Sequence, residues 1–395
     1  MWQLGFFFHE MASSLLSVFL PLYIIAIGGS LVDVGIMSSS AVFLTIPSSF
    51  FWGYICDKTG RYKRYILISF LASTVLLYLF TLTTGVVLLI ILYAAMSILH
   101  VAHEPPKNVL ISELYTHEEW EKTFAFYEGF TQTGRLIGLL LGLFMSIYGI
   151  GAASTLILCS GLNLVACIMS LILVTDPLLV FERSLVRIEK AIDFTYNGVV
   201  IASKILDGLS LNERLKKENL SAFCSGLVLF SLAGSILFTP LPIFFSKELA
   251  LPASVVFALY MLKSGGEVSG YFLAGSRSSQ PAEKSRISRI VIFRSMLAFL
   301  LLAVTGMSAY GIALAAVILT LMGFVYALFL VLMLSLSMEL IPIGKAGLFN
   351  ALVGIGGACG SFIGPFFAQT LGFTYVFLTA GIILFLAYVA LKIFT

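Results

Sequence analysis

The sequence predicts an all-α membrane protein with twelve transmembrane helices in two pseudo-symmetric six-helix bundles. The prediction rests on the composition, on apolar runs of spanning length, and on the distribution of lysine and arginine. Of the 395 residues, 59% are hydrophobic and 11% are charged, whereas soluble domains carry about 25% charged residues. A soluble fold of this length would lack the charge to cover its surface, so lipid is the expected solvent.

Twelve apolar runs are long enough to cross a bilayer, whose hydrocarbon core of about 30 Å needs roughly 20 residues of helix. The runs of the first half lie near 3–28, 34–56, 64–82, 86–113, 121–148 and 151–174. Those of the second half lie near 220–246, 253–275, 289–306, 310–338, 345–370 and 373–394. We therefore expect an N-terminal bundle over 1–175 and a C-terminal bundle over 220–395.

The segment 176–219 between the two halves is a long polar interval. Within it, apolar residues such as Leu185, Ile188 and Ile192 recur at helical spacing. This pattern predicts an amphipathic helix at the cytoplasmic interface. A linker without regular structure is the alternative.

The basic residues predict the orientation, because cytoplasmic loops of membrane proteins are enriched in lysine and arginine. With both termini cytoplasmic, eighteen of the 23 lysines and arginines lie inside and only Lys247 lies outside. The other four, Lys107, Arg135, Lys263 and Arg294, fall within spans. Of these, Arg294 is expected to extend its long side chain to the inner surface. The cytoplasmic (plasma) membrane is the expected location.

Charge and cysteine usage exclude several classes of protein. The net charge of +3 and the absence of a basic patch interleaved with aromatic residues argue against a nucleic-acid partner. The five cysteines are odd in number and scattered through apolar stretches, so neither a disulfide framework nor a metal site is expected from them. The N-terminus lacks a basic region and a cleavage site, and is expected to begin the first membrane helix.

Glycines repeat between the halves at an offset of 226 residues. Gly134 and Gly138 in the fifth span correspond to Gly360 and Gly364 in the eleventh. Pro365 follows the last of these glycines and has no counterpart in the fifth span. Small residues at this spacing are typical of closely packed membrane helices.

The loop between the second and third spans combines Gly53, Asp57, Gly60, Arg61 and Arg64. Gly53 would allow a neighbouring helix to approach closely, and Gly60 would permit a tight turn. Asp57 would cap the positive end of a nearby helix. The loop resembles the signature loop of the major facilitator superfamily, and the twelve-span plan extends that resemblance over the whole chain.

The resemblance implies a secondary transporter with a central cavity lined by helices 1, 4, 7 and 10, with helices 2, 5, 8 and 11 beside them. It implies that Asp57 and Arg61 act in a conformational switch, in which a contact with helix 11 latches the halves in the outward-facing state. Helix 5 is also similar to the family's antiporter motif, but its proline is present only in helix 11, as Pro365. Antiport and simple close packing therefore both remain open for these glycines.

Four predicted helices carry polar residues three or four positions apart, which places each set on one face of its helix. These residues are His9, Glu10, Ser13 and Ser17 on helix 1; His100, His103, Glu104 and Lys107 on helix 4; Glu128, Thr131, Gln132 and Arg135 on helix 5; and Tyr260, Lys263, Glu267 and Tyr271 on helix 8. A charge at a helix centre costs about 2.5–3.5 kcal/mol on insertion scales. We therefore expect the four stripes to face one aqueous cavity, beside the helix break predicted at Pro105-Pro106.

Two interpretations of the charged residues stay open. In the first, Arg135 and Lys263 hold an anionic or zwitterionic group, and one of Glu104, Glu128 or Glu267 carries a coupling proton, because burial raises a carboxyl pKa. Glu10, His103 and Lys107 complete this candidate site. In the second, the pairs Glu104–Lys107, Glu128–Arg135 and Lys263–Glu267 are intrahelical ion pairs that only stabilise packing.

The predicted function is secondary active transport of a small anionic or zwitterionic organic solute across the cytoplasmic membrane by alternating access, coupled to protons. A multidrug efflux pump, suggested by 34 phenylalanines, and a non-transporting sensor are the alternatives. No nucleotide-binding loop is present, so no cofactor is expected. His100 and His103 lie only three positions apart, unlike a zinc-protease pair, so neither a metal site nor an enzyme is predicted. The protein is expected to be monomeric.

Overall fold

The computed structural model describes residues 2–83, 85–114, 120–176, 220–276, 284–305, 310–340 and 346–394. Regular structure in these ranges is helical. The first half contains α1 (Gln3–Ala26), α2 (Leu31–Thr59), α3 (Tyr62–Thr81), α4 (Val86–His100), η1 (Val101–His103), α5 (Glu104–Leu114), α6 (Trp120–Ile147) and α7 (Ala152–Leu173). The second contains α9 (Leu220–Phe238), α10 (Leu241–Ile243), η4 (Phe244–Glu248), α11 (Ala253–Ser276), α12 (Lys284–Val304), α13 (Tyr310–Leu340), α14 (Ala346–Thr370) and α15 (Phe373–Phe394).

The helices follow the predicted spans closely. Within the described ranges, eleven helical segments are long and apolar enough to cross a membrane. The remaining predicted span is α11, a continuous helix of 24 residues whose Lys263, Glu267 and small polar residues lower its hydropathy. The predicted cytoplasmic helix falls in 177–219, outside the described residues.

The predicted break in the fourth span is present. Helix α4 ends at His100, and the 3-10 turn η1 precedes α5. Pro105 and Pro106 therefore stand in the first turn of α5, where a proline removes no helical hydrogen bond. The backbone N–H of Glu104 bonds to Val101 in the 3-10 pattern, which leaves the carbonyl of His100 for side chains. Ser69 of α3 and His103 both donate to that oxygen, each at 2.6 Å.

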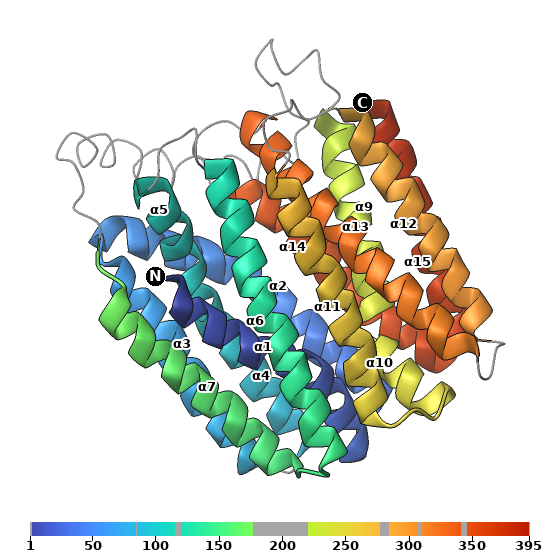
Figure 1. Ribbon diagram of the computed structural model, residues 1–395, viewed down its shortest axis with the longest axis horizontal. Coiled ribbons are helices and arrows are strands. Elements are labelled where there is room, and N and C mark those ends of the chain that lie inside the picture. Colours follow the sequence, from blue (N-terminus) through green and yellow to red (C-terminus); the bar gives the residue numbers. More distant parts are fainter. Residues whose placement is uncertain are drawn as a thin grey trace.

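The helices form two groups that meet along two long contacts (Figure 1). In the first half α1 packs against α6 and α7, and α3 packs against α7. In the second half α9 packs against α14 and α15, and α11 packs against α13. The two groups contact each other through α6 with α11 and through α2 with α14. Together with the helical content, this arrangement confirms the predicted pair of six-helix bundles.

Glycines of α6 allow its close crossing with α1. A Cβ atom placed on Gly134 would lie 2.7 Å from the carbonyl oxygen of Phe7. A Cβ on Gly138 would collide with the carbonyl oxygen of Met11, one turn further along α1. The backbones of the two helices are therefore in direct contact, as predicted for small residues at this spacing.

The second half repeats the same crossing. Cβ atoms on Gly360 and Gly364 of α14 would collide with the carbonyl oxygens of Leu232 and Ile236 of α9. The contacted residues are themselves four positions apart, as in the first half. The glycine repeat found in the sequence is thus a repeat of one helix crossing. Pro365 lies within α14.

Candidate functional site

A central cavity of about 570 Å³ lies between the two halves. Its polar lining comprises Ser13, Ser14, Ser17, Ser38, Gln132, Arg135, Ser231, Ser235, Thr239, Lys263, Ser264, Glu267 and Arg294. Its aromatic lining comprises Tyr93, Phe230, Phe238, Tyr260, Tyr326 and Phe329. Helices of both halves contribute side chains, so any movement of one half against the other changes the shape of this cavity.

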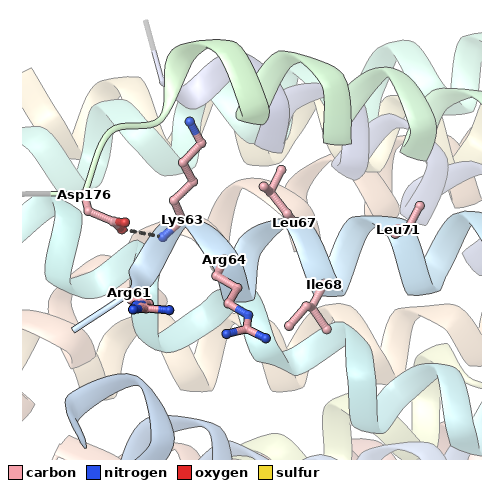
Figure 2. A pocket seen from close by; sticks show the side chains of 7 residues that line it. All are labelled: Arg61, Lys63, Arg64, Leu67, Ile68, Leu71 and Asp176. Carbon is pink, nitrogen blue, oxygen red and sulfur yellow. Dashed lines mark hydrogen bonds between the residues drawn. The ribbon is translucent and has the colours of Figure 1, made fainter. Parts of the chain in front are cut away.

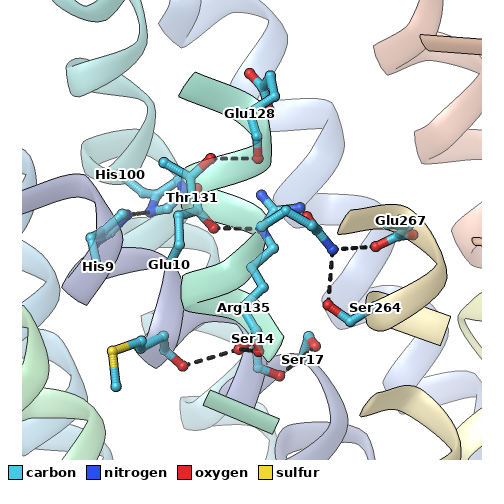
Figure 3. Close-up of polar contacts among 12 residues, drawn as sticks. His9, Glu10, Ser14, Ser17, His100, Glu128, Thr131, Arg135, Ser264 and Glu267 are labelled. Carbon is cyan, nitrogen blue, oxygen red and sulfur yellow. Dashed lines mark hydrogen bonds and ion pairs between the residues drawn. The ribbon is translucent and has the colours of Figure 1, made fainter. Parts of the chain in front are cut away.

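One amide joins the two halves at the cavity. Gln132 of α6 donates to the carboxylate of Glu267 and, at 3.0 Å, to the hydroxyl of Ser264, both on α11. Figure 3 labels these two acceptors. Glu267 is 5% exposed and also forms an ion pair with Lys263, one turn earlier on α11. The predicted intrahelical pair Lys263–Glu267 therefore exists, and it also takes part in a contact between the halves.

Arg135 forms its ion pair across helices. Its Nε donates to Glu10 of α1 at 2.7 Å (Figure 3), and 48% of its side chain is exposed towards the cavity. The expected intrahelical pairing of Arg135 with Glu128 is thus replaced by a contact between α6 and α1. Glu128 is half-buried one turn from Thr131, and it lies outside the cavity lining.

Arg294 of α12 is a cavity residue that the sequence did not reveal. It is 3% exposed, and its guanidinium lies 4.6 Å from the ring centre of Phe230, 4.9 Å from that of Tyr326 and 5.7 Å from that of Phe238. The expectation that it reaches the inner surface is wrong, because it points between these rings into the cavity lining. Its Nε and Nη1 are buried without a hydrogen-bond acceptor among the described residues.

The polar residues of the fourth span form a separate cluster within the first half. Lys107 pairs with Glu104 at 2.5 Å, as predicted, and lies over the ring of Tyr127 at 5.5 Å. Neither charged residue lines the central cavity. The four predicted polar stripes therefore do not all face one cavity. The stripes of α1, α6 and α11 contribute side chains to the cavity, and the stripe of the fourth span packs beside it.

Histidines from two spans come together near this cluster. His9 of α1 lies 3.1 Å from His100, measured from Nε2 to Nδ1, and the ring of His103 lies 4.9 Å from each of theirs. His9 and His103 are each 1% exposed. The sequence shows only the pair in the fourth span, because His9 is 91 positions from His100.

The signature loop is mostly helical, because Gly53 and Asp57 lie in the last two turns of α2 and Arg64 lies in the first turn of α3. Gly60 adopts a left-handed conformation with φ of 62° and ends α2 by donating to Cys56, which agrees with the predicted tight turn. At Gly53 a Cβ would meet nothing within 4 Å, so the close approach predicted there is not made by the described residues in this conformation and stays a prediction. The latch predicted for Asp57 stays a prediction, since the residues preceding α14, 341–345, lie outside the described ranges.

A shallow hollow lies beside the same loop (Figure 2). Arg61, Lys63 and Arg64 line it at the start of α3, together with apolar residues of the next turns. Asp176, after α7, accepts a hydrogen bond of 2.7 Å from the backbone N–H of Lys63. The contact fixes the start of α3 against the end of α7.

Comparison with known proteins agrees with this architecture. The family model of the Major Facilitator Superfamily matches residues 4–353. No curated protein sequence matches this chain. Among solved structures, a mutant of the nucleoside transporter NupG superposes with a TM-score of 0.67 at 13% identity, covering 100% of this chain and 99% of that one.

A second similar structure is a bacterial homologue of the human lysosomal transporter Spinster, in an inward-facing and unoccupied conformation. It superposes with a TM-score of 0.65 at 13% identity and covers 100% of this chain and 96% of that chain. Likeness at this identity concerns the fold alone, which has the twelve-helix plan expected from the sequence. The family model spans most of the chain, and the chain is therefore a multi-pass membrane protein of the major facilitator superfamily.

Proposed function

We propose that this protein is a secondary active transporter that moves a small organic anion or zwitterion by alternating access. The observation that carries the proposal is Arg294. The cavity's other two cations have carboxylate partners, since Arg135 pairs with Glu10 and Lys263 pairs with Glu267. One positive charge therefore remains for a solute, and an anionic group would relieve the cost of burying it.

The aromatic rings around Arg294 favour a solute with an apolar or planar part next to the anion. Phe230, Phe238 and Tyr326 already contact the guanidinium and offer further ring surface in the cavity. The same rings are the observation in favour of the competing function, efflux of lipophilic compounds. The two functions differ in the charge of the solute, because a lipophilic cation would be repelled by Arg294.

The contacts between the halves support an inward-facing state. At the start of α2, the N–H of Val32 donates to Gln369 of α14 at 2.9 Å, and Gly35 lies against Pro365. These contacts are at the opposite end of α2 from the signature loop, where Gly53 has open space. If the loop lies in the cytoplasm, as the positive-inside rule indicates, these contacts would close the cavity on the outer side. The Spinster homologue is likewise inward-facing.

Glu267 is the proposed carrier of a coupling proton. A proton there would neutralise the partner of Lys263 and weaken the bond from Gln132, which joins the halves. The proton would thus free Lys263 for the solute and loosen one contact between the bundles at the same time. We also propose a monomer in the cytoplasmic membrane with both termini inside, as the basic residues indicate.

The test compares Arg294→Met with Lys247→Met, a change at an exposed lysine outside the cavity. Thermal unfolding of the purified proteins would be measured with organic anions, zwitterions and lipophilic cations, since a ligand of the folded state raises its stability. We expect anions to raise the melting temperature of wild type and of Lys247→Met, and to have no effect on Arg294→Met.

Uptake of the stabilising anion into proteoliposomes should show the same pattern. We expect Arg294→Met to lose uptake while its ligand-free melting temperature stays at or above that of wild type, because an unpaired buried charge is removed. The proposal would be overturned if lipophilic cations raised the melting temperatures of wild type and Arg294→Met equally and anions raised neither. That result would favour efflux of lipophilic compounds.

A further inference from the structure

We propose that His9, His100 and His103 bind a divalent transition-metal ion of the zinc class inside the first half. Each histidine offers one ring nitrogen, and these three nitrogens all lie within 4.8 Å of one another. Neutral imidazole is a common ligand of zinc, which takes four ligands in tetrahedral geometry. The sequence predicted no metal site, because it shows only the two histidines of the fourth span side by side.

The first ligand nitrogen belongs to His9. The side-chain amide of Asn163 donates to the carbonyl of Cys159 at 2.8 Å, which fixes its oxygen towards His9. That oxygen lies 2.6 Å from Nδ1 of His9, so Nδ1 carries the hydrogen. Nε2 then presents its lone pair towards His100, at 3.1 Å. A metal-bound histidine is held by the same kind of second hydrogen bond.

His103 is oriented in the same way by the break in the fourth span. Its Nδ1 lies 2.6 Å from the carbonyl oxygen of His100, which only accepts. In a neutral ring Nε2 would then carry a lone pair, and it lies 3.3 Å from a carboxylate oxygen of Glu104. Two acceptors at this distance need a cation between them, either a metal ion or a proton on Nε2. This contact is the second observation that agrees with a bound cation.

The surroundings suit a resident ion. The ring of Phe70 stacks on that of His9 at 4.5 Å, and Phe6 lies against His103 at 5.7 Å, so two of the three ligands stand in a dry apolar shell. His100 is partly exposed, which would leave the ion a route of entry. None of the three histidines is among the residues that line the central cavity, which indicates a bound ion rather than a transported one.

The ion would link α1 to the turn between α4 and α5. His9 comes from α1, His100 is the last residue of α4, and His103 is the last residue of η1. Three imidazoles favour zinc, cobalt or copper over magnesium or calcium, which prefer oxygen ligands. The fourth position would be filled by water or by Glu104, whose carboxylate lies 3.3 Å from Nε2 of His103.

The experiment measures metal binding by the purified full chain, prepared with a histidine-free affinity tag and stripped with a chelator. Cobalt would be titrated and its visible ligand-field absorption recorded, and zinc would be counted by mass spectrometry. We expect one ion per chain and a melting temperature that rises with zinc concentration. These readouts do not depend on transport, so they test this site separately from the proposed function.

The variant is His100→Asn, whose amide can still donate to His9, and the matched control is His117→Ala. His117 is the remaining histidine of the sequence and lies outside the described residues. We expect His117→Ala to bind one ion and His100→Asn to bind at least tenfold more weakly with its ligand-free melting temperature kept. The proposal is overturned if folded wild type binds neither cobalt nor zinc at pH 7. It is also overturned if His100→Asn binds the metal as tightly as wild type does. In either case a proton on His103, rather than a metal ion, satisfies Glu104.

Discussion

The three cavity cations differ in what balances their charge. Arg135 and Lys263 each form an ion pair with a carboxylate, whereas Arg294 packs against aromatic rings and feels Glu267 only at longer range. A cation over desolvated rings gains about 2 kcal/mol, which is smaller than the several kcal/mol that burial of an ion costs. Under the proposed function, Arg294 would destabilise the empty protein and stabilise its complex with an anion.

At the scale of single residues, the proposed proton coupling can be tested at Glu267. Glu267→Gln keeps an acceptor for Gln132 and removes the negative charge that a proton would neutralise. We expect the variant to exchange solute between the inside and the outside of the vesicles when both hold the same concentration. Under a pH gradient, we expect it to accumulate at least tenfold less solute than wild type. Both assays use proteoliposomes, with Glu248→Gln, an exposed position beyond α10, as the control. Gradient-driven accumulation at the wild-type level would remove Glu267 from the coupling step.

The candidate site was predictable from the sequence only where its contacts are local. The pairs Glu104–Lys107 and Lys263–Glu267 follow from helical periodicity, and both are present. Contacts between distant positions leave no such signal. Arg135 meets Glu10 across 125 positions, and the inward direction of Arg294 depends on how α12 is rotated against its neighbours.

At the scale of single elements, the spans were predictable because a segment that crosses lipid must be a long helix that satisfies its own backbone hydrogen bonds. The prolines also indicated the break in the fourth span. The groups that satisfy the freed His100 carbonyl were not predictable, since Ser69 comes from α3. A similar break separates α9 from α10, where Pro240 and Pro242 interrupt the seventh span. That interruption was missed because the run stays apolar throughout.

The glycine crossings predict a steep dependence on side-chain size. Gly138→Leu and Gly364→Leu would each force a backbone carbonyl of the neighbouring helix aside, and overpacking of this kind costs about 1–3 kcal/mol or more. We expect both variants to unfold at clearly lower temperature. Gly161→Leu is the control, because a Cβ there meets nothing within 4 Å and the position is exposed on α7. Equal stability of all three variants would show that the crossings tolerate bulk.

At the scale of the whole molecule, the proposed alternating access requires the contact between Val32 of α2 and Gln369 of α14 to open. A Cβ on Gly35 would lie 3.2 Å from that of Pro365, near the 3.5–4.5 Å spacing typical of disulfides. We expect oxidised Gly35→Cys/Pro365→Cys protein to lose uptake and to regain it after reduction. The single variants control for loss of the native residues, and a cross-linked protein with full uptake would contradict movement at this contact.

The amide of Gln132 has a further consequence, for how tightly a good substrate binds. Because this one group bonds to Ser264 and Glu267 of the opposite half, a solute that competes for Glu267 also acts on the equilibrium between the two conformations. Linkage makes the effect mutual, so the factor by which a solute shifts that equilibrium equals the ratio of its affinities for the two states. A solute that left the bridge intact would occupy the cavity and hold the protein in one state, and would inhibit. Under the proposed mechanism, a transported solute would bind only moderately, because part of its interaction energy would break the bridge.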